Sequence, residues 1–329
     1  MRHSLLALLL SSSLATPLAA HGQSLYKMTF LPPNTTPHAI DASGRIVGVN
    51  VDGRGFVWSR GAMTNLGTLG GNSSVATAIG PKTQVTGASP AKNGVSHAFV
   101  YNGSTLRDIG MLNGQPSFGT AINAAGQVAG YALDRQGNDR AFLYSGSKMT
   151  AIGSLGSGVA RATGINGAGT VVGVSFLRGF TAQRAFLYAN GVMKDLGTLG
   201  GPSSAAAAVN ERGEVAGMSF VNADIQHAFL YRGGAMIDIG SFGGPNTEAR
   251  ALNNAGMVVG YSTRANDLPG QSFSRAFLYR DGVMHDLNDL VAKRGTWTVL
   301  DAVGINDARQ IAAYACTDLG DCRAVLLEP

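Results

Sequence analysis

The sequence is poor in charged residues. They make up 14% of the 329 residues, against about 25% in an average soluble protein. Together with a hydrophobic content of 45%, this excludes a disordered chain, which is typically more charged and less apolar. The formal net charge is only +5, and the arginines are spread along the chain. Proteins that bind nucleic acid concentrate basic residues on one face or helix, so we predict no nucleic-acid partner.

Long apolar runs are also absent after the first twenty residues. Because a membrane-spanning helix needs about 20 apolar residues, we expect no membrane span. Residues 1–20 combine a basic start at Arg2, an apolar run over 5–10 and small residues at 18–20, a pattern typical of a cleaved export signal. We therefore expect a signal peptide at 1–20 and a secreted or periplasmic mature chain over 21–329.

The chain has only two cysteines, Cys316 and Cys322. In an oxidising compartment such a pair most simply forms a disulfide, and closing so short a loop stabilises a fold by roughly 2 kcal/mol in the chain-entropy description. A metal site is the alternative. It is less favoured because no histidine lies nearby in the sequence and the spacing differs from C-x₂₋₄-C. We predict the disulfide and expect no metal or other cofactor.

Glycine is abundant, with 46 residues, and much of it belongs to a repeat. The pattern Ala-Ile-Asn-x-x-Gly-x-Val-x-Gly is clearest at 121–130 and recurs along the chain. A second element, Arg/His-Ala-Phe-Leu-Tyr, follows each copy, and most copies continue with a third, Met-x-Asp-Leu-Gly. Seven units result, and their closing positions are Gly48, Gly87, Gly130, Gly173, Gly217, Gly260 and Ala313.

These elements predict a β-propeller. Each is short, rich in Val, Ile, Phe and Tyr, and bounded by Gly or Asn, which is typical of strands joined by tight turns. In Asn-x-x-Gly the asparagine caps its own turn and the glycine allows a positive φ. Units of about 43 residues match the length of a propeller blade. Unit seven lacks its third element, which residues 25–31 resemble. We therefore predict an all-β, seven-bladed propeller forming one domain over 21–329. Its repeat units start near residue 38, and strand 25–31 completes the last blade.

The repeat resembles a known family. His-Ala-Phe at 97–99 and 227–229, with Asp-Leu-Gly-Thr-Leu-Gly-Gly at 195–201, is similar to the HAF-repeat family of bacterial extracellular proteins. The resemblance covers about 39–329 and implies an exported, repetitive β protein, but it transfers no catalytic residues. Two units depart from the pattern. Unit two has Gly80-Pro81-Lys82 in place of Asn-x-x-Gly, and unit seven has lost those glycines and gained the cysteines.

One repeat position, two residues before the phenylalanine, carries an arginine or histidine in every unit. One interpretation is a ring of positive charge that binds an anionic polymer. We favour structural pairing with a carboxylate on the adjacent strand, for which Asp108, Asp195, Asp238 and Asp286 are candidates. The repeated phenylalanine itself is expected to pack between blades. The cation positions are Arg54, His97, Arg140, Arg184, His227, Arg275 and Arg323.

Function is expected where the repeats diverge. At the position before the small residue of the asparagine-turn strand, three units have threonine, whereas unit one has His38 and unit six has Arg250. In a closed ring, units one and six are separated only by unit seven, so these two side chains should approach one another near the channel. They are our candidate binding residues. The connection over 261–274 is also longer than its equivalents, and long loops often carry sites.

No catalytic constellation is present. The sequence has no G-x-S-x-G, H-E-x-x-H or P-loop motif, so we predict no catalytic residues. We expect a secreted, monomeric, non-catalytic propeller that binds a surface glycan, polymer or protein. The alternative is an exported hydrolase or lyase with its active site at the channel mouth, which rests on analogy between folds.

Overall fold

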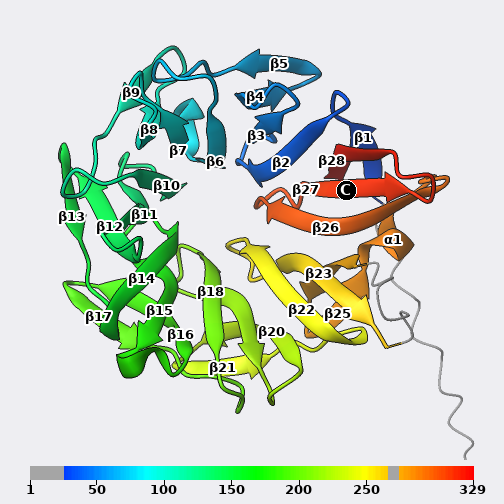
Figure 1. Cartoon of the computed structure of the whole chain (residues 1–329). Helices are drawn as coiled ribbons and strands as arrows, with labels where there is room; N and C mark the ends of the chain where they lie inside the picture. The colour runs from blue at the N-terminus through cyan, green and yellow to red at the C-terminus, as the bar shows by residue number, and fades with distance from the viewer. Residues whose placement is uncertain (1–25, 266–273) are drawn as a thin grey trace, which may run out of the picture.

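The computed structural model describes residues 26–265 and 274–329. The expected signal peptide at 1–20 and most of the long connection after Tyr261 lie outside the described residues. Within them the regular secondary structure is almost entirely β-strand, and the sheets are set around a common centre (Figure 1). No helix in the two described ranges has the length and apolar character needed to cross a membrane.

Each unit contributes a set of antiparallel strands, of which the first lies nearest the centre and the next ones follow outward (Figure 1). In unit seven the outermost strand is β1 (Lys27–Phe30), from the start of the described chain. The first, innermost strands are β2 (Thr35–Ile40), β6 (Val75–Ile79), β10 (Ser117–Ile122), β14 (Gly156–Ile165), β18 (Ser204–Val209), β22 (Gly243–Leu252) and β26 (Trp297–Ile305). The second strands are β3 (Ile46–Asn50), β7 (Val85–Pro90), β11 (Val128–Leu133), β15 (Val171–Leu177), β19 (Val215–Phe220), β23 (Val258–Arg264) and β27 (Ile311–Thr317).

The third strands carry the Arg/His-Ala-Phe element. They are β4 (Gly55–Ser59), β8 (Ser96–Tyr101), β12 (Asp139–Ser145), β16 (Gln183–Ala189), β20 (Gln226–Arg232), β24 (Arg275–Arg280) and β28 (Cys322–Glu328). The outer strands are β1 (Lys27–Phe30), β5 (Ala62–Asn65), β9 (Leu106–Asp108), β13 (Lys148–Ala151), β17 (Val192–Asp195), β21 (Ala235–Asp238) and β25 (Val283–Asp286). Short helical turns are η1 (Pro81–Thr83), η2 (Arg178–Phe180) and α1 (Leu287–Leu290).

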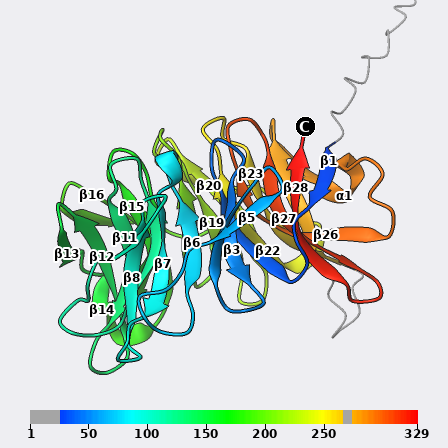
Figure 2. The same ribbon diagram turned by 90° about the horizontal axis from the view of Figure 1, so that it is seen from above.

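The strands of the described residues form five four-stranded sheets and one eight-stranded sheet. The eight-stranded sheet contains units five and six, which a single parallel pair, Gln226 with Asn246, connects. Strand β1 pairs antiparallel with β28, with Lys27 opposite Glu328 and Phe30 opposite Val325. The first described strand therefore lies in the same sheet as the last one, as Figure 2 also shows.

The core consists of seven apolar clusters that lie between neighbouring units. In one of them Phe99 of unit two packs with Val47 and Val57 of unit one. In another, Phe56 of unit one packs with Leu31 and with Leu326 of unit seven. The repeated phenylalanines therefore pack between sheets, as the sequence predicted. All six are 0% exposed: Phe56, Phe99, Phe142, Phe186, Phe229 and Phe277.

The closing glycine of each repeat allows two strands to approach closely. A Cβ atom on Gly130 would lie 2.1 Å from the carbonyl oxygen of Phe118 and 2.7 Å from the Phe142 ring. Unit seven has Ala313 at this position, and its inner strand differs. Strand β26 has a register shift between Val299 and Asp301, immediately before the one that every inner strand has at this level. The second shifts of β14 and β22 lie farther from this level. The alanine is thus accompanied by an extra bulge in the opposing strand.

The turn asparagines have a second role that the sequence reasoning missed. The Oδ1 atom of Asn123 accepts hydrogen bonds from its own turn, as expected, and its Nδ2 donates to the carbonyl oxygen of Asn166 in the next unit, at 2.9 Å. Gly80 of unit two has no side chain to make this bond. The bond recurs from Asn166 to Asn210, Asn210 to Asn253, Asn253 to Asn306 and Asn306 to Asp41.

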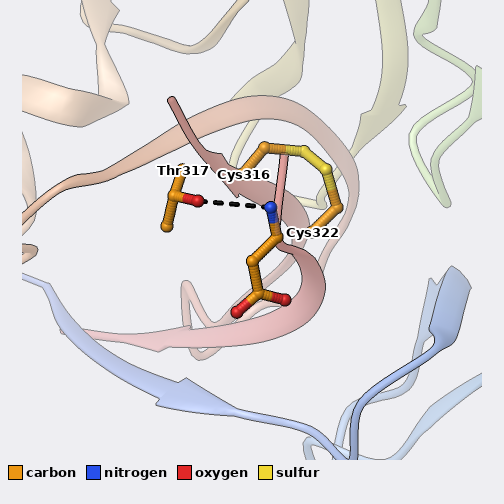
Figure 3. Close-up of a disulfide and its surroundings, with 4 residues drawn as sticks. Cys316, Thr317 and Cys322 are labelled. Atoms are coloured by element: carbon orange, nitrogen blue, oxygen red, sulfur yellow. Dashed lines mark hydrogen bonds between the residues drawn. A yellow bond between two sulfur atoms is a disulfide. The ribbon is translucent and has the colours of Figure 1, made fainter. Parts of the chain in front are cut away.

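Cys316 and Cys322 form a disulfide, as predicted. They lie opposite one another on β27 and β28, next to the hairpin turn (Figure 3). Within the same hairpin the backbone N–H of Asp321 donates to Thr317 Oγ1 at 3.2 Å. The cross-link therefore joins the two strands of unit seven that flank the hairpin tip.

Candidate functional site

The structure places the repeat cations on the third strands, where several face an aspartate of the outer strand. In three units the side chain lies against the aspartate that the sequence suggested. These pairs are His97 Nδ1 with Asp108 Oδ2 at 2.6 Å, His227 Nδ1 with Asp238 Oδ2 at 2.8 Å, and Arg184 Nε with Asp195 Oδ2 at 3.8 Å.

Asp286, the fourth suggested partner, is engaged elsewhere. Its Oδ1 caps helix α1 by accepting from Asn288 N at 2.9 Å, and its Oδ2 pairs with Arg264 at 2.6 Å. In the described parts of the chain neither Arg54 nor Arg275 forms an ion pair. The cation position therefore does not have one uniform partner.

The other two cations are held locally. Arg140 pairs with Asp134 at 2.6 Å, and the backbone N–H of Asn138, with the side chains of Asn138 and Arg140, holds the pKa of Asp134 at about 2. Arg323 pairs with Asp321 at 3.2 Å. These contacts lie within or beside single hairpins, so they do not create a shared surface.

His38 lies at the bulge of β2 and contacts the next unit. Its Nδ1 is 2.7 Å from the carbonyl oxygen of Ala76, which can only accept, so Nδ1 carries the proton. Within the described residues Nε2 has no hydrogen-bond partner. Threonines at this position make the same bond, from Thr77 to Gly119, Thr120 to Ala162 and Thr163 to Ala206, at 2.6–2.9 Å. His38 therefore keeps the contact between units and adds an imidazole nitrogen.

Arg250 occupies the same position in β22 but has different partners. Its guanidinium lies 3.0 Å from Glu248 Oε2 and 3.2 Å from Asp301 Oδ2, and it stacks over the Tyr261 ring at 5.0 Å. One arginine thus faces two carboxylates from neighbouring units. If both carboxylates are ionised, the cluster has a surplus of one negative charge.

Burial dominates the electrostatics of this cluster. It raises the pKa of Asp301, an effect that Arg250 opposes and Glu248 reinforces. Burial also raises the pKa of Tyr261, to about 12, with the Glu248 carboxylate adding to the effect. The Oδ1 atom of Asp301 is buried and has no hydrogen-bond partner within the described residues. Both shifts favour the protonated forms of these side chains.

His38 and Arg250 line the same cavity, of about 540 Å³. Its walls are formed by inner strands β2, β14, β18, β22 and β26, which lie around one side of the centre in Figure 1. The threonine position is replaced in units five, six, seven and one, by Ala207, Arg250, Val303 and His38, and all four line this cavity. The structure thus brings together the two residues that the sequence singled out.

The two carboxylates were not among the residues predicted from the sequence. Glu248 and Asp301 occupy one repeat position, two residues before the bulge. The other units have no carboxylate there, so their coincidence in adjacent units was an available signal. The residues at this position are Thr36, Val75, Phe118, Arg161, Ala205, Glu248 and Asp301. Among the described residues, no group of three or more His, Cys, Asp and Glu side chains is placed to hold a metal ion.

No protein-family model matches the chain, and no curated protein matches it either. Similar solved structures include TolB from Acinetobacter baumannii, which is 14% identical with a TM-score of 0.51 over 88% of this chain and 64% of TolB. The β-propeller domain of the Trilobed protease from Pyrococcus furiosus is 10% identical, with a TM-score of 0.54 over 93% and 94% of the two chains.

A puromycin-hydrolyzing peptidase from Mycobacterium tuberculosis is 11% identical, with a TM-score of 0.55 over 92% of this chain and 51% of that one. The chain thus spans less than two thirds of the length of TolB and about half that of the peptidase. At these identities the likeness concerns the fold alone, and the fold is an all-β propeller.

Proposed function

We propose that the protein is an exported, non-catalytic propeller of the HAF-repeat kind that binds a ligand in the cavity lined by His38 and Arg250. The observation that carries the proposal is the change at the threonine position. Four consecutive units have another residue in place of the threonine, and these four residues line one cavity. A purely structural array would keep the same residue at this position in every unit, whereas a binding site requires the symmetry to be broken on one side.

The proposal includes a closed ring of seven blades in a single, monomeric domain over 21–329. Three contacts support closure. Strand β1 pairs with β28, Leu31 and Leu326 share an apolar cluster with Phe56 of unit one, and Asn306 of unit seven donates to the carbonyl oxygen of Asp41 in unit one at 2.9 Å. The eight-stranded sheet counts as two blades because one residue pair alone connects its halves.

Export is supported by two features. The disulfide between Cys316 and Cys322 is of a kind that persists mainly in oxidising compartments. The first twenty residues also have the pattern of a cleaved signal. Both favour a secreted or periplasmic location.

The cavity chemistry favours a ligand rich in hydroxyl groups. When both carboxylates are ionised, Glu248 and Asp301 outnumber Arg250 and repel an anionic polymer, whereas hydroxyl groups can donate to carboxylate oxygens. Apolar side chains such as Met218 and Val303 complete the wall, and small-ligand sites typically combine apolar walls with a few placed polar groups. A neutral glycan chain fits this description best.

A hydrolase or lyase is the second candidate, and one observation favours it. The carboxylates of Glu248 and Asp301 both form ion pairs with Arg250, and burial raises the pKa of Asp301. Acid–base catalysis uses carboxyl groups whose environments differ in this way. In the non-catalytic case a ligand is recovered unchanged after incubation, whereas an enzyme converts it.

The test is thermal melting of the protein with neutral glycans, anionic polymers and small metabolites. A ligand at 100 times its Kd adds about 2.7 kcal/mol of stability, which raises Tm by a few degrees. We expect a neutral glycan to give such a shift. His38→Thr should abolish it, because it restores the repeat residue and removes only the imidazole.

Thr77→Ala is the matched control. It removes the equivalent contact between units outside the cavity, so the ligand-induced shift should persist. A shift that survives His38→Thr, or the absence of any shift across the panel, would contradict the proposed site. Mass analysis of the incubated glycan distinguishes binding from turnover.

A further inference from the structure

We propose a second binding site, at the outer edge of unit seven over Phe30 and Trp297, that takes an acidic sugar bearing a carboxylate. It is separate from the cavity lined by His38 and Arg250 and uses none of the residues of that cavity. The proposal rests on an aromatic pair, a pocket beside it and a local excess of positive charge.

Phe30 is an exception to the repeat. It lies on β1, opposite Val325 of β28. In four other units the outer-strand residue opposite the repeated phenylalanine is an aspartate: Asp108, Asp195, Asp238 and Asp286. Unit seven therefore presents an aromatic ring where these units present a carboxylate.

The replacement of the aspartate by Phe30 changes the surroundings of Arg323, the repeat cation of unit seven. Its guanidinium lies over aromatic rings, 5.6 Å from the centroid of Trp297 and 6.0 Å from that of Phe30. Its ion-pair partner is the exposed Asp321 of its own hairpin, at 3.2 Å. The positive charge of Arg323 thus remains beside the aromatic pair.

The two rings form an accessible apolar surface. Their centroids are 4.7 Å apart with an interplanar angle of 53°, and Phe30 is 39% exposed, whereas the six repeated phenylalanines are fully buried. Both rings line a pocket of about 660 Å³, a size within the ~300–1,000 Å³ typical of small-ligand sites. A protein partner would instead cover a broad surface of ~800 Å² on this side. The shape therefore favours one or a few sugar units.

The positive charge of the pocket determines which kind of sugar it can bind. Lys27 and Lys293 line it, are exposed, and form no ion pair within the described residues. Arg294 also lines it and donates to the carbonyl oxygens of Asn288 and Trp297, and it pairs with no carboxylate in the described chain. Cations beside an apolar face suit a sugar ring that carries a carboxylate, because ammonium and guanidinium groups bind carboxylates through charge-assisted hydrogen bonds.

The chain provides its own reporter for this site. It has two tryptophans, and Trp58 is 4% exposed in the core. A Trp58→Phe variant therefore leaves Trp297 as the sole tryptophan. We expect oligogalacturonate to change its fluorescence saturably, with binding weakened by added salt, and the neutral galacto-oligosaccharide of equal length to cause no change.

Variants in the same background locate the site. Lys27→Gln with Lys293→Gln should weaken oligogalacturonate binding at least tenfold. Lys148→Gln is the matched control, because Lys148 has the position in unit three that Lys27 has in unit seven, and it should leave binding unchanged. His38→Thr should also leave it unchanged, so failure of the channel proposal and failure of this one are distinguishable.

Several results would overturn the inference. One is an unchanged Trp297 signal with oligogalacturonate, and another is equal binding of the neutral oligosaccharide. Unchanged oligogalacturonate binding by the Lys27→Gln, Lys293→Gln double variant would overturn it as well. Equally tight binding of polyglutamate would show that the site recognises anionic chains in general rather than an acidic sugar.

Discussion

At the residue scale, the closing glycine is required by packing rather than by backbone conformation. Gly130 is not among the residues with positive φ, so an alanine there would suffer no torsional penalty. Its Cβ would instead meet the Phe118 carbonyl oxygen at 2.1 Å. In unit seven, which has Ala313, the strand opposite has an additional bulge and Val325 stands where other units have the repeated phenylalanine.

Gly130→Ala should therefore destabilise the protein by about 1–3 kcal/mol, the usual range for overpacking. The reciprocal change, Ala313→Gly, adds no atoms. It should cost ~0.5–1 kcal/mol through backbone entropy, together with the loss of one buried methyl group, since Ala313 is fully buried. Urea unfolding of both variants measures the difference. Equal losses would show that the close approach at Gly130 is relieved without strain.

Asp301 should make stability depend on pH in an unusual direction. Its pKa is raised in the folded state, chiefly by burial, so the folded protein binds the proton more tightly than the unfolded chain does. The contribution of Asp301 to stability therefore increases as pH falls through its folded pKa, and is constant below its unfolded pKa of about 3.9.

Asp301→Asn removes this titration and keeps a side chain of similar size. Relative to the variant, the unmodified protein should gain stability as pH is lowered from neutral toward 4, as measured by urea unfolding across that range. A difference that stays constant, or that grows in the opposite direction, would show that Arg250 outweighs burial in fixing the charge of Asp301.

At the element scale, strands and turns were predictable because they depend on local patterns. The alternation of apolar residues and the Asn-x-x-Gly turns identify the strands that follow one another along the chain. Contacts between units could not be predicted in this way. Asn123 and Thr120 donate hydrogen bonds to backbone carbonyl oxygens some forty residues away, and every residue type has a backbone carbonyl, so the sequence does not identify the acceptor. Divergence in the repeat identified His38 and Arg250. The two carboxylates around Arg250 also diverge from the repeat, but only the adjacency of β22 and β26 shows that both contact the same guanidinium.

At the scale of the whole molecule, the proposed closure depends on β1, near the start of the described chain, completing the sheet of unit seven at its end. In a ring each unit buries both faces of its sheet, whereas an open array leaves two end faces exposed to water. Leu31 is 2% exposed and shares a cluster with Phe56, also buried, of unit one. Because Ala324 and Leu326 of β28 belong to the same cluster, segments near the two ends of the described chain contribute to one core.

If the ring is closed in this way, Leu31 and Phe56 should be energetically coupled. Leu31→Ala and Phe56→Ala should each cost several kcal/mol, as large-to-small core substitutions do. The double variant should lose less than the sum, because contacting residues typically couple by about 0.5–3 kcal/mol. Pairing Leu31→Ala with Phe142→Ala, in a different cluster, provides the control and should be additive. Strict additivity for Leu31 with Phe56 would mean that β1 does not seal the junction between units seven and one. A chain beginning at residue 33 that still unfolds in one transition, at the same Tm as the full chain, would mean the same.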